Sequence, residues 1–368
     1  MPKAHETILE VDLEALRHNY TYLRSKLESN TRFMAVVKAF AYGSDATTIA
    51  LFLQDLGVDY FAVAYVHEGV SLRNSGITKP ILVLHPQTPN FKELIDRCLE
   101  PNLYSLDTLQ EFISCAEGLD QKDYPVHLKF NTGLNRLGFK HTVIPEITSK
   151  INASSAIKVV SIFSHLAASE DHNENDFSLS QIETFESISR QFKQSVGYDF
   201  KAHICNTSGT LNFPQAHYDM VRCGIGLYGF GNSESENKNF KPIARLKSVI
   251  SQIHVLQDGD TLGYNRAFTS TGTMRTATIP IGHADGIGRH YGNGKGYVYI
   301  NGQKAHILGN VCMDMIMVNV SDIACQEGDE VIIFDAHHTA ESLAASTDSI
   351  SYELITSISQ RVKRVFIG

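Results

Sequence analysis

A lysine at the end of a short apolar run is the first residue whose type and position could do chemistry. Lys38 follows the run M-A-V-V at 34–37, and Phe40 and Tyr42 come shortly after it. Such neighbours exclude water from an amine and lower its pKa, because the charged form loses its hydration. A neutral lysine amine can form a Schiff base with an aldehyde. A lysine at a strand end is more often a solvated charge, so Lys38 alone is weak evidence.

A glycine-spaced loop is the second candidate. The segment V-R-C-G-I-G-L-Y-G at 221–229 follows another apolar run, and the backbone N–H groups of such loops bind phosphate. By itself the loop could be a tight turn. A lysine that bonds an aldehyde and a loop that binds phosphate together indicate pyridoxal 5'-phosphate (PLP) as cofactor.

Further polar residues stand at the ends of apolar runs. They are Lys129 and Arg136 near the run 125–130, His165 after 157–164, Asn206 and Thr207 after 201–205, and Arg222 within 219–223. Each alone is as consistent with a structural role. Chance placement would not put most of them at the same end of successive runs, so together they predict one site.

The apolar runs are the elements that must position these residues. Eight runs read as strands, at 33–38, 60–64, 80–85, 102–106, 125–130, 157–164, 201–205 and 219–223. They do not alternate apolar and polar residues, as expected for strands buried on both faces. Amphipathic stretches separate them, and residues 13–27 read as a helix before the first run. Eight such units predict a (β/α)8 TIM-type barrel, with catalysis at the C-terminal strand ends. A doubly wound open sheet is the alternative, because counting strands does not show closure.

The residue pattern changes after the polar, turn-rich stretch 231–239, and the pattern that follows is typical of strands. Asn301-Gly302 separates two strand-like runs within 297–308 and predicts a type I′ hairpin. Asp258-Gly259 marks another turn, and a late helix at about 351–361 precedes a final strand. We therefore expect a barrel over 12–235 and a mostly-β domain over 240–368, joined by the N-terminal strand within 1–11.

Composition excludes several classes of protein. The 368 residues include 40 acidic and 32 basic side chains, a balance that argues against nucleic acid or an anionic membrane as partner. The six cysteines form no C-x-x-C pair and have no metal-site spacing, so we expect reduced thiols and no metal. The sequence shows no apolar run of about 18 residues and no signal peptide, which favours a cytoplasmic protein.

Several segments resemble the alanine racemase family of PLP enzymes, which have a barrel and a C-terminal β-domain. These segments are A-V-V-K-A-F-A-Y-G at 35–43, N-T-G-L-N-R-L-G-F at 131–139, D-M-V-R-C-G-I-G-L-Y-G at 219–229, L-G-Y-N-R-A-F-T at 262–269, I-P-I-G-H-A-D-G at 279–286 and V-C-M-D at 311–314. They span both expected domains in order, which is more specific than any single motif.

The resemblance implies a role for each matching residue. Lys38 would hold PLP and act on D-alanine, while Tyr264 of the partner subunit in a homodimer would act on L-alanine. Arg136 and the partner subunit's Met313 would contact the amino acid, and Arg222 would face the PLP ring nitrogen. The remaining implied cofactor-binding residues are Tyr42, His165, Asn206, Thr207, Gly224, Ile225 and Tyr352. His165 would assist Tyr264, His203 would stand behind Arg222, and Lys129 matches a lysine that can be carbamylated.

The sequence also departs from the family pattern. Phe40 replaces an Asn, Ser44-Asp45 replaces His-Gly, and His283 replaces a Tyr. We expect racemisation of alanine, supplying D-alanine for peptidoglycan. Alternatives are a racemase of broader small amino acids, a barrel-type PLP amino-acid decarboxylase, and a PLP carrier protein. Arg222 and V-C-M-D favour a racemase, and the residues after 240 argue against a carrier.

Overall fold

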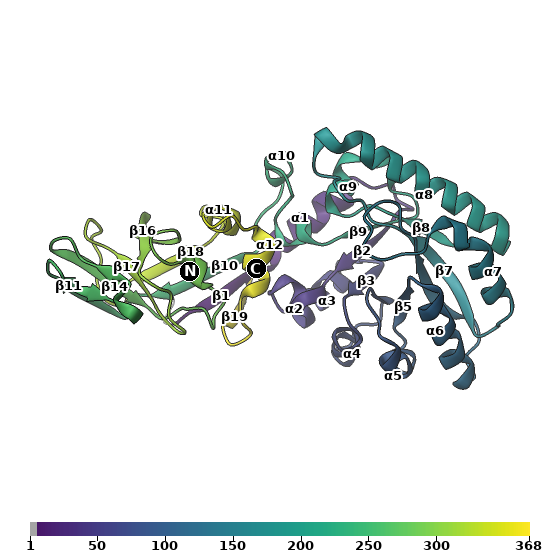
Figure 1. Cartoon of the computed structure of the whole chain (residues 1–368), viewed down its shortest axis with the longest axis horizontal. Coiled ribbons are helices and arrows are strands. Elements are labelled where there is room, and N and C mark those ends of the chain that lie inside the picture. The colour runs from purple at the N-terminus through teal and green to yellow at the C-terminus, as the bar shows by residue number, and fades with distance from the viewer. Residues whose placement is uncertain (1–5) are drawn as a thin grey trace. The chain divides into compact units, whose positions relative to one another are not determined.

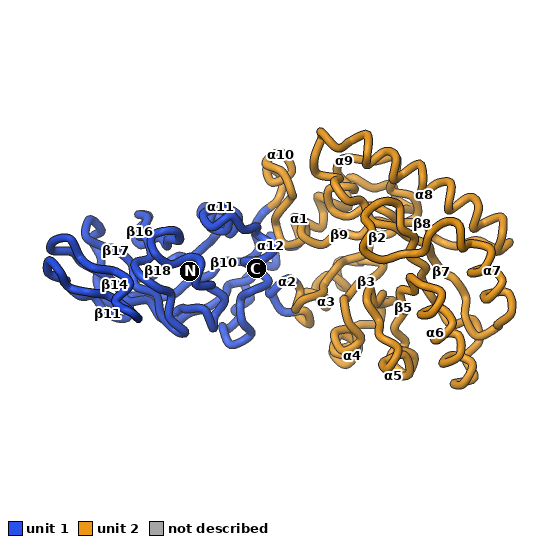
Figure 2. The backbone as a smooth tube through the Cα atoms, in the orientation of Figure 1, with its two compact units in different colours: residues 1–16, 42–45, 241–368 blue, residues 17–41, 46–240 orange. Residues whose placement is uncertain are grey.

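The computed structural model of the protein describes residues 6–368 (Figure 1). Its backbone divides into two compact units, shown in different colours in Figure 2. The β unit comprises residues 1–16, 42–45 and 241–368, and the barrel unit comprises residues 17–41 and 46–240. Residues 1–5 of the expected N-terminal strand lie outside the described residues.

The barrel unit contains an eight-stranded parallel sheet. Its strands are β2 (Arg32–Val36), β3 (Tyr60–Val63), β4 (Ile81–Val83), β5 (Glu100–Leu103), β6 (Tyr124–Lys129), β7 (Ile157–Phe163), β8 (Lys201–His203) and β9 (Met220–Cys223). The hydrogen-bonded order is β8-β7-β6-β5-β4-β3-β2-β9. The two end strands are also joined, because Asp219 N–H donates to Ala202 O at 3.2 Å and Arg222 N–H donates to Cys205 O at 3.0 Å. The predicted TIM-type barrel is therefore confirmed, and the sheet is not open.

Helices follow the barrel strands, as Figure 1 shows. They are α3 (Ala46–Asp55), α4 (Val66–Asn74), α5 (Phe91–Asp96), α6 (Leu106–Gly118), α7 (Ile144–Asn152), α8 (Asn175–Val196) and α9 (Thr207–Asn212), with α10 (Glu234–Asn237) near the end of the unit. The long α8 ends where Gly197 takes the left-handed conformation, φ 74°. The first helix, α1 (Leu13–Arg24), ends three residues before the predicted position. Arg24 there donates to Thr31 O and Ser29 O, which turns the chain away from the helix axis.

The β unit is built on a nine-stranded sheet of order β11-β14-β17-β16-β15-β18-β10-β1-β19. The strands are β1 (Ile8–Asp12), β10 (Ala244–Val249), β11 (Gln252–Leu256), β14 (Met274–Ile279), β15 (Tyr297–Ile300), β16 (Gln303–Leu308), β17 (Ile316–Asn319), β18 (Glu330–Phe334) and β19 (Lys363–Ile367), and β12 (Thr261–Leu262) pairs separately with β13 (Phe268–Thr269). Strand β1 pairs with β10 and β19. Asn301 and Gly302 have φ angles of 49° and 75° between β15 and β16, so the predicted type I′ hairpin is confirmed.

Further details differ from the sequence prediction. The late helix α12 (Ser351–Ser357) ends four residues early, because the Arg364 guanidinium takes the carbonyls of Ile358, Ser359 and Val362 and turns the chain toward β19. A short helix, α11 (Ala340–Ala345), precedes it and was not predicted. Lys38 does not end a strand, because β2 ends at Val36. Among residues 6–368, every helix is too short or too polar to cross a bilayer.

Candidate active site

Lys38 begins a turn of unusual backbone conformation, α2 (Lys38–Tyr42). The four residues after it, Ala39 to Tyr42, have φ angles of 50–56°, the left-handed region. An L-residue in that region costs about 1–2 kcal/mol. The turn begins directly after the barrel strand, where Ala41 N–H donates to Val37 O at 3.0 Å. Lys38 therefore leaves the strand end on a strained and defined path.

The carboxylate of Glu68 holds this turn in place. Its Oε1 accepts Ala39 N–H at 2.7 Å, and its Oε2 accepts the N–H groups of Ala64 and Tyr65 at 2.7 and 3.0 Å. One side chain therefore ties the turn after β2 to the start of α4. Sequence reasoning missed Glu68. Its position three residues after Tyr65, the residue that caps α4, is the helix-start signal that could have found it.

Cationic side chains gather at the C-terminal ends of the barrel strands. Burial lowers the pKa of Lys38, with the charge of Arg136 acting in the same direction and Glu68 opposing them. Burial, together with the charges of Arg222, Arg136 and Lys38, lowers the pKa of Lys129 to about 8. These mutual effects mean that the four cations lie close enough to repel one another. The predicted convergence of residues distant in sequence thus occurs within the barrel unit.

A tight loop after β6 carries Arg136. Asn131 N–H donates to Phe139 O at 2.9 Å, and Phe139 N–H donates to Lys129 O at 2.8 Å, so the loop returns to its own starting strand. Gly138 makes this return possible, because its φ is +134° and a Cβ there would lie 2.7 Å from the backbone of Phe130. The motif N-T-G-L-N-R-L-G-F therefore encodes a closed loop that holds Arg136 beyond the strand end.

Arg222 is buried on β9 and is held by several acceptors. Its guanidinium donates to His203 Nδ1 at 2.7 Å, to Ser164 O at 2.7 Å and to His165 Nδ1 at 3.1 Å. Burial lowers the pKa of Arg222 to about 10, which leaves it protonated at neutral pH. Burial and the Arg222 charge hold the pKa of His165 well below its usual value, so this imidazole is neutral with its proton on Nε2.

The glycine-spaced loop after β9 packs against the start of α9. The N–H groups of Gly224 and Gly226 each donate to Thr207 Oγ1 at 3.3 Å. The Asn206 side chain caps α9 by accepting Gly209 N–H at 2.8 Å, and Ile225 is buried beside this loop. Two backbone segments expected to bind phosphate are therefore adjacent in the barrel unit.

Two further predicted residues, Tyr42 and Tyr352, lie in the β unit. Their ring centroids are 6.1 Å apart. Burial raises the pKa of Tyr42, so this hydroxyl stays protonated and can donate a hydrogen bond. Gly43 follows with φ +85°, and a Cβ there would clash with Ile355 O. The close approach of Gly43 to α12 brings the two tyrosines together.

Tyr264 and Met313 also belong to the β unit, where both are unusually exposed. Tyr264 is 74% exposed and Met313 is 58% exposed, and the two line one recess together with His283, Arg289 and Cys312. His283 N–H donates to Cys312 O and Ala284 N–H donates to Met313 O, at 2.9 and 3.0 Å. Large apolar side chains that remain exposed together often mark a binding surface.

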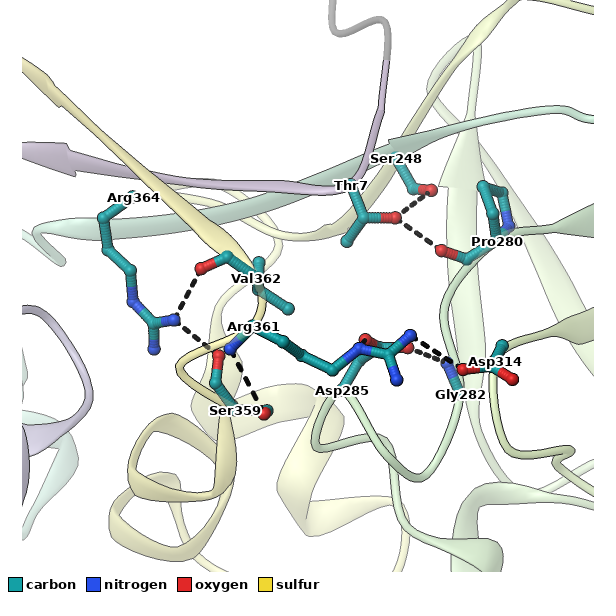
Figure 3. A network of polar contacts seen from close by, with 10 residues as sticks. All are labelled: Thr7, Ser248, Pro280, Gly282, Asp285, Asp314, Ser359, Arg361, Val362 and Arg364. Carbon is teal, nitrogen blue, oxygen red and sulfur yellow. Dashed lines mark hydrogen bonds and ion pairs between the residues drawn. The ribbon is translucent and has the colours of Figure 1, made fainter.

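An arginine network fixes the loops beside this recess (Figure 3). The Arg361 guanidinium contacts Asp285 at 3.0 Å and Asp314 at 2.7 Å, and Asp285 Oδ2 accepts Gly282 N–H at 2.8 Å. A Cβ at Gly282 would lie 2.4 Å from Met313 O, so only glycine allows this approach. The loop with Met313 is therefore held rigidly although its side chain is exposed.

The fold and the cationic strand ends define a class of protein, a two-unit barrel protein with a half-buried lysine of lowered pKa at the C-terminal ends of its strands. Residues 11–231 match the family model of the alanine racemase N-terminal domain, and residues 243–366 match that of the alanine racemase C-terminal domain. The chain belongs to the alanine racemase family, and its enzyme class is that of the isomerases.

Known relatives are similar over the whole chain. The alanine racemase of Geobacter sp. (strain M21) is 33% identical over 98% of this chain and 99% of its own. The solved structure of alanine racemase from Clostridium difficile 630 has a TM-score of 0.92 and 33% identity, covering 100% of this chain and 97% of that one. A structure of alanine racemase from Bartonella henselae with covalently bound pyridoxal phosphate has a TM-score of 0.88 and 29% identity, covering 99% and 100%.

Proposed function

We propose that this protein interconverts L- and D-alanine with PLP as its cofactor, and that Lys38 and Tyr264 are the two bases. The proposal rests on the cluster of cationic side chains near Lys38, namely Lys129, Arg136 and Arg222. Burial and Arg136 lower the pKa of the Lys38 amine, which increases its neutral and nucleophilic fraction.

The chemistry of the barrel residues fits PLP, which is an anionic aldehyde. Lys38 can bond the aldehyde, and the buried charges of Lys129 and Arg222, together with the exposed guanidinium of Arg136, favour binding of an anion. Arg222 would face the ring nitrogen, near His165. The proposed phosphate-binding groups are Tyr42, Asn206, Thr207, Gly224, Ile225 and Tyr352.

In this proposal, Lys38 and Tyr264 act on opposite faces of one carbon. Bound PLP supplies an electron sink for the Cα–H bond of the amino acid. The neutral Lys38 amine takes the Cα proton of D-alanine, and the partner subunit's Tyr264 gives one from the other face. The reverse direction exchanges the two roles, so inversion requires both groups. Arg136 binds the carboxylate of the substrate.

Neighbouring residues adjust this chemistry. His165 is neutral and carries its proton on Nε2, so it would help Tyr264 as a hydrogen-bond donor rather than as a cation. Arg222 stays charged and would keep the ring nitrogen unprotonated, which weakens the electron sink and disfavours transamination. The neutral amine of Lys129 can add CO2 and lose a proton, and the carbamate anion so formed would relieve repulsion with Arg136.

The exposed Tyr264 and Met313 support a homodimer with shared sites. An aromatic ring that is 74% exposed beside a methionine that is 58% exposed is typical of a surface that another surface covers. We propose that a second copy covers it and that each barrel receives both residues from its partner. As in the family's established role, D-alanine made in the cytoplasm would supply peptidoglycan, and a strain lacking the gene would then require added D-alanine.

Substitution of each base tests the mechanism. Lys38→Ala should abolish the absorbance band of lysine-bound PLP, and retention of that band would refute the lysine assignment. Tyr264→Phe should nearly stop racemisation while PLP stays bound. Tyr299→Phe, which removes a hydroxyl on β15 of the same unit, is the matched control and should leave the rate unchanged. Normal rates in both directions for Tyr264→Phe would remove Tyr264 from the mechanism.

Mixed dimers test the shared site. Co-expression of Lys38→Ala chains with Tyr264→Phe chains creates hybrid dimers in which one of two sites has an intact lysine and an intact tyrosine. Random pairing makes half of the dimers hybrids, so activity should recover to about a quarter of the wild-type value. If both bases came from one chain, every site would lack one base, and mixing would restore nothing.

Product analysis separates racemisation from other PLP chemistry. Incubation with L-alanine should yield D-alanine. Release of CO2 would indicate a decarboxylase, and absence of any product would indicate a carrier protein. Chiral analysis over a panel of small L-amino acids would show whether the protein is a broader racemase.

A further inference from the structure

A chain of buried polar side chains crosses the interior of the barrel unit behind Arg222. His203 Nδ1 lies 2.7 Å from the Arg222 guanidinium, and His203 Nε2 lies 3.1 Å from Ser161 Oγ. Ser161 Oγ lies 2.5 Å from His127 Nδ1, and His127 Nε2 lies 2.6 Å from Glu100 Oε2. The five residues come from the five successive strands β5 to β9, and each is at most 9% exposed.

The two ends of this chain fix its direction. Arginine can only donate hydrogen bonds, so His203 Nδ1 accepts and the proton of His203 is on Nε2. His203 then donates to Ser161, whose hydroxyl donates to His127 Nδ1. His127 in turn carries its proton on Nε2 and donates to Glu100, because an ionised carboxylate can only accept. In this arrangement, every donor points from Arg222 toward Glu100.

The surroundings favour this single arrangement. Burial and the Arg222 charge hold the pKa of His203 well below its usual value, which keeps the ring neutral. The His203 ring stacks on Phe163 with centroids 4.9 Å apart and planes 3° apart, so it cannot turn freely. At the other end, Tyr60 also hydrogen-bonds Glu100, and burial together with this contact raises the pKa of the tyrosine. The Glu100 carboxylate therefore has two hydrogen-bond partners, His127 and Tyr60.

We propose that Glu100, His127, Ser161 and His203 form a positioning relay that holds the Arg222 guanidinium in one orientation. The NH2 group of Arg222 lies within hydrogen-bond distance of three acceptors on neighbouring loops, Ser164 O, His165 Nδ1 and Ile204 O. The relay takes one donor of NH1. The arginine then presents a fixed edge at the strand ends. The role of that edge rests on the proposed function, in which Arg222 faces the cofactor ring.

The protonation of the two rings tests the relay without any activity measurement. Neutron diffraction of the holoenzyme, or 15N NMR of its histidine rings, should find His127 and His203 each protonated on Nε2 alone. A proton on Nδ1 of either ring would overturn the proposal. This outcome is independent of whether the protein racemises alanine, so failure of the relay and failure of the proposed function are distinguishable.

A substitution in the middle of the relay tests its effect on catalysis. Ser161→Ala removes the one hydroxyl that joins the two rings, and should lower kcat by about tenfold while KM for alanine stays within about twofold. The matched control is Ser178→Ala, because Ser178 is equally buried but its hydroxyl has no hydrogen-bond partner among the described residues. A Ser161→Ala enzyme with the kcat of Ser178→Ala would overturn the proposal, and if it fails to fold, the ring protonation decides.

Discussion

Replacement of Ala39 by glycine should stabilise the protein, although glycine usually destabilises. Ala39 has φ 53° and an exposed side chain, so Ala39→Gly relieves a left-handed strain of about 1–2 kcal/mol and uncovers little apolar surface. Glycine loses about 0.5–1 kcal/mol more conformational entropy on folding. The difference predicts a gain of about 0.5–1 kcal/mol, or about 1–3 °C in Tm.

A second alanine provides the matched control. Ala153 is also exposed but has the ordinary φ of −81° at the end of α7. Ala153→Gly relieves no strain and should cost about 0.5–1 kcal/mol. The assay is urea unfolding of both variants and the wild type at equal protein and PLP concentration. The two substitutions should shift the free energy of unfolding in opposite directions, and a loss at Ala39 equal to that at Ala153 would refute the strain argument.

The Ala39→Gly variant should also show what the strained turn contributes to activity. Glu68 accepts three backbone N–H groups, one of them from Ala39, and hydrogen bonds to a charged group contribute about 1.5–3 kcal/mol each. This clamp offsets the strain and fixes the path of the residue before it, Lys38. Ala39→Gly gives that path more freedom, so we expect lower racemase activity in a more stable protein.

Two further substitutions test the site and its surroundings. Gly138→Ala places a Cβ 2.7 Å from backbone at φ +134°, so it should lower the free energy of unfolding by about 3 kcal/mol and raise KM for alanine through Arg136. Gly118→Ala, where a Cβ meets open space, should not destabilise, and equal stabilities of the two would contradict the reasoning. His165 and His203 are neutral when folded and bind protons below about pH 6.5 when unfolded, so unfolding should become easier as pH falls. Each histidine lowers the free energy of unfolding by about 1.3 kcal/mol between pH 7 and pH 5.5. His203→Asn should reduce this decrease by the contribution of one histidine, when the free energy of unfolding is measured at the two pH values. An unchanged pH dependence in that variant would contradict a neutral His203.

Local sequence determined several features directly. Asn301-Gly302 specified its hairpin, because both residues must take positive φ and these two types do so readily. The eight apolar runs located the barrel strands, since strands buried on both faces are largely apolar, although β5 begins at Glu100, two residues before the run 102–106. The end of α12 was not predictable in this way, because Arg364, seven residues farther along, takes the carbonyls that would have continued the turn.

The backbone conformation explains a departure from the family pattern that the sequence alone does not. Asp45 stands where the family has glycine, and its φ of 107° lies in the region that favours glycine. The sequence alone identified the substitution but gave no reason for the family's preference. Phe40, another departure, also lies in the left-handed turn, at φ 56°. Both positions therefore concern the conformation of the segment after Lys38.

The sequence by itself determined the strand-forming runs, the types of side chain at their ends and the family, because these follow from hydrophobic pattern and from motifs of neighbouring residues. Tertiary structure alone decided which cations repel one another, that Glu68 clamps the lysine turn, and that Glu100 and His127 stand behind Arg222. Closing the sheet brings together side chains from five strands that span more than a hundred residues. Their pKa values and donor directions depend on that proximity and on burial. Neither the proximity nor the burial follows directly from the order of residues along the chain.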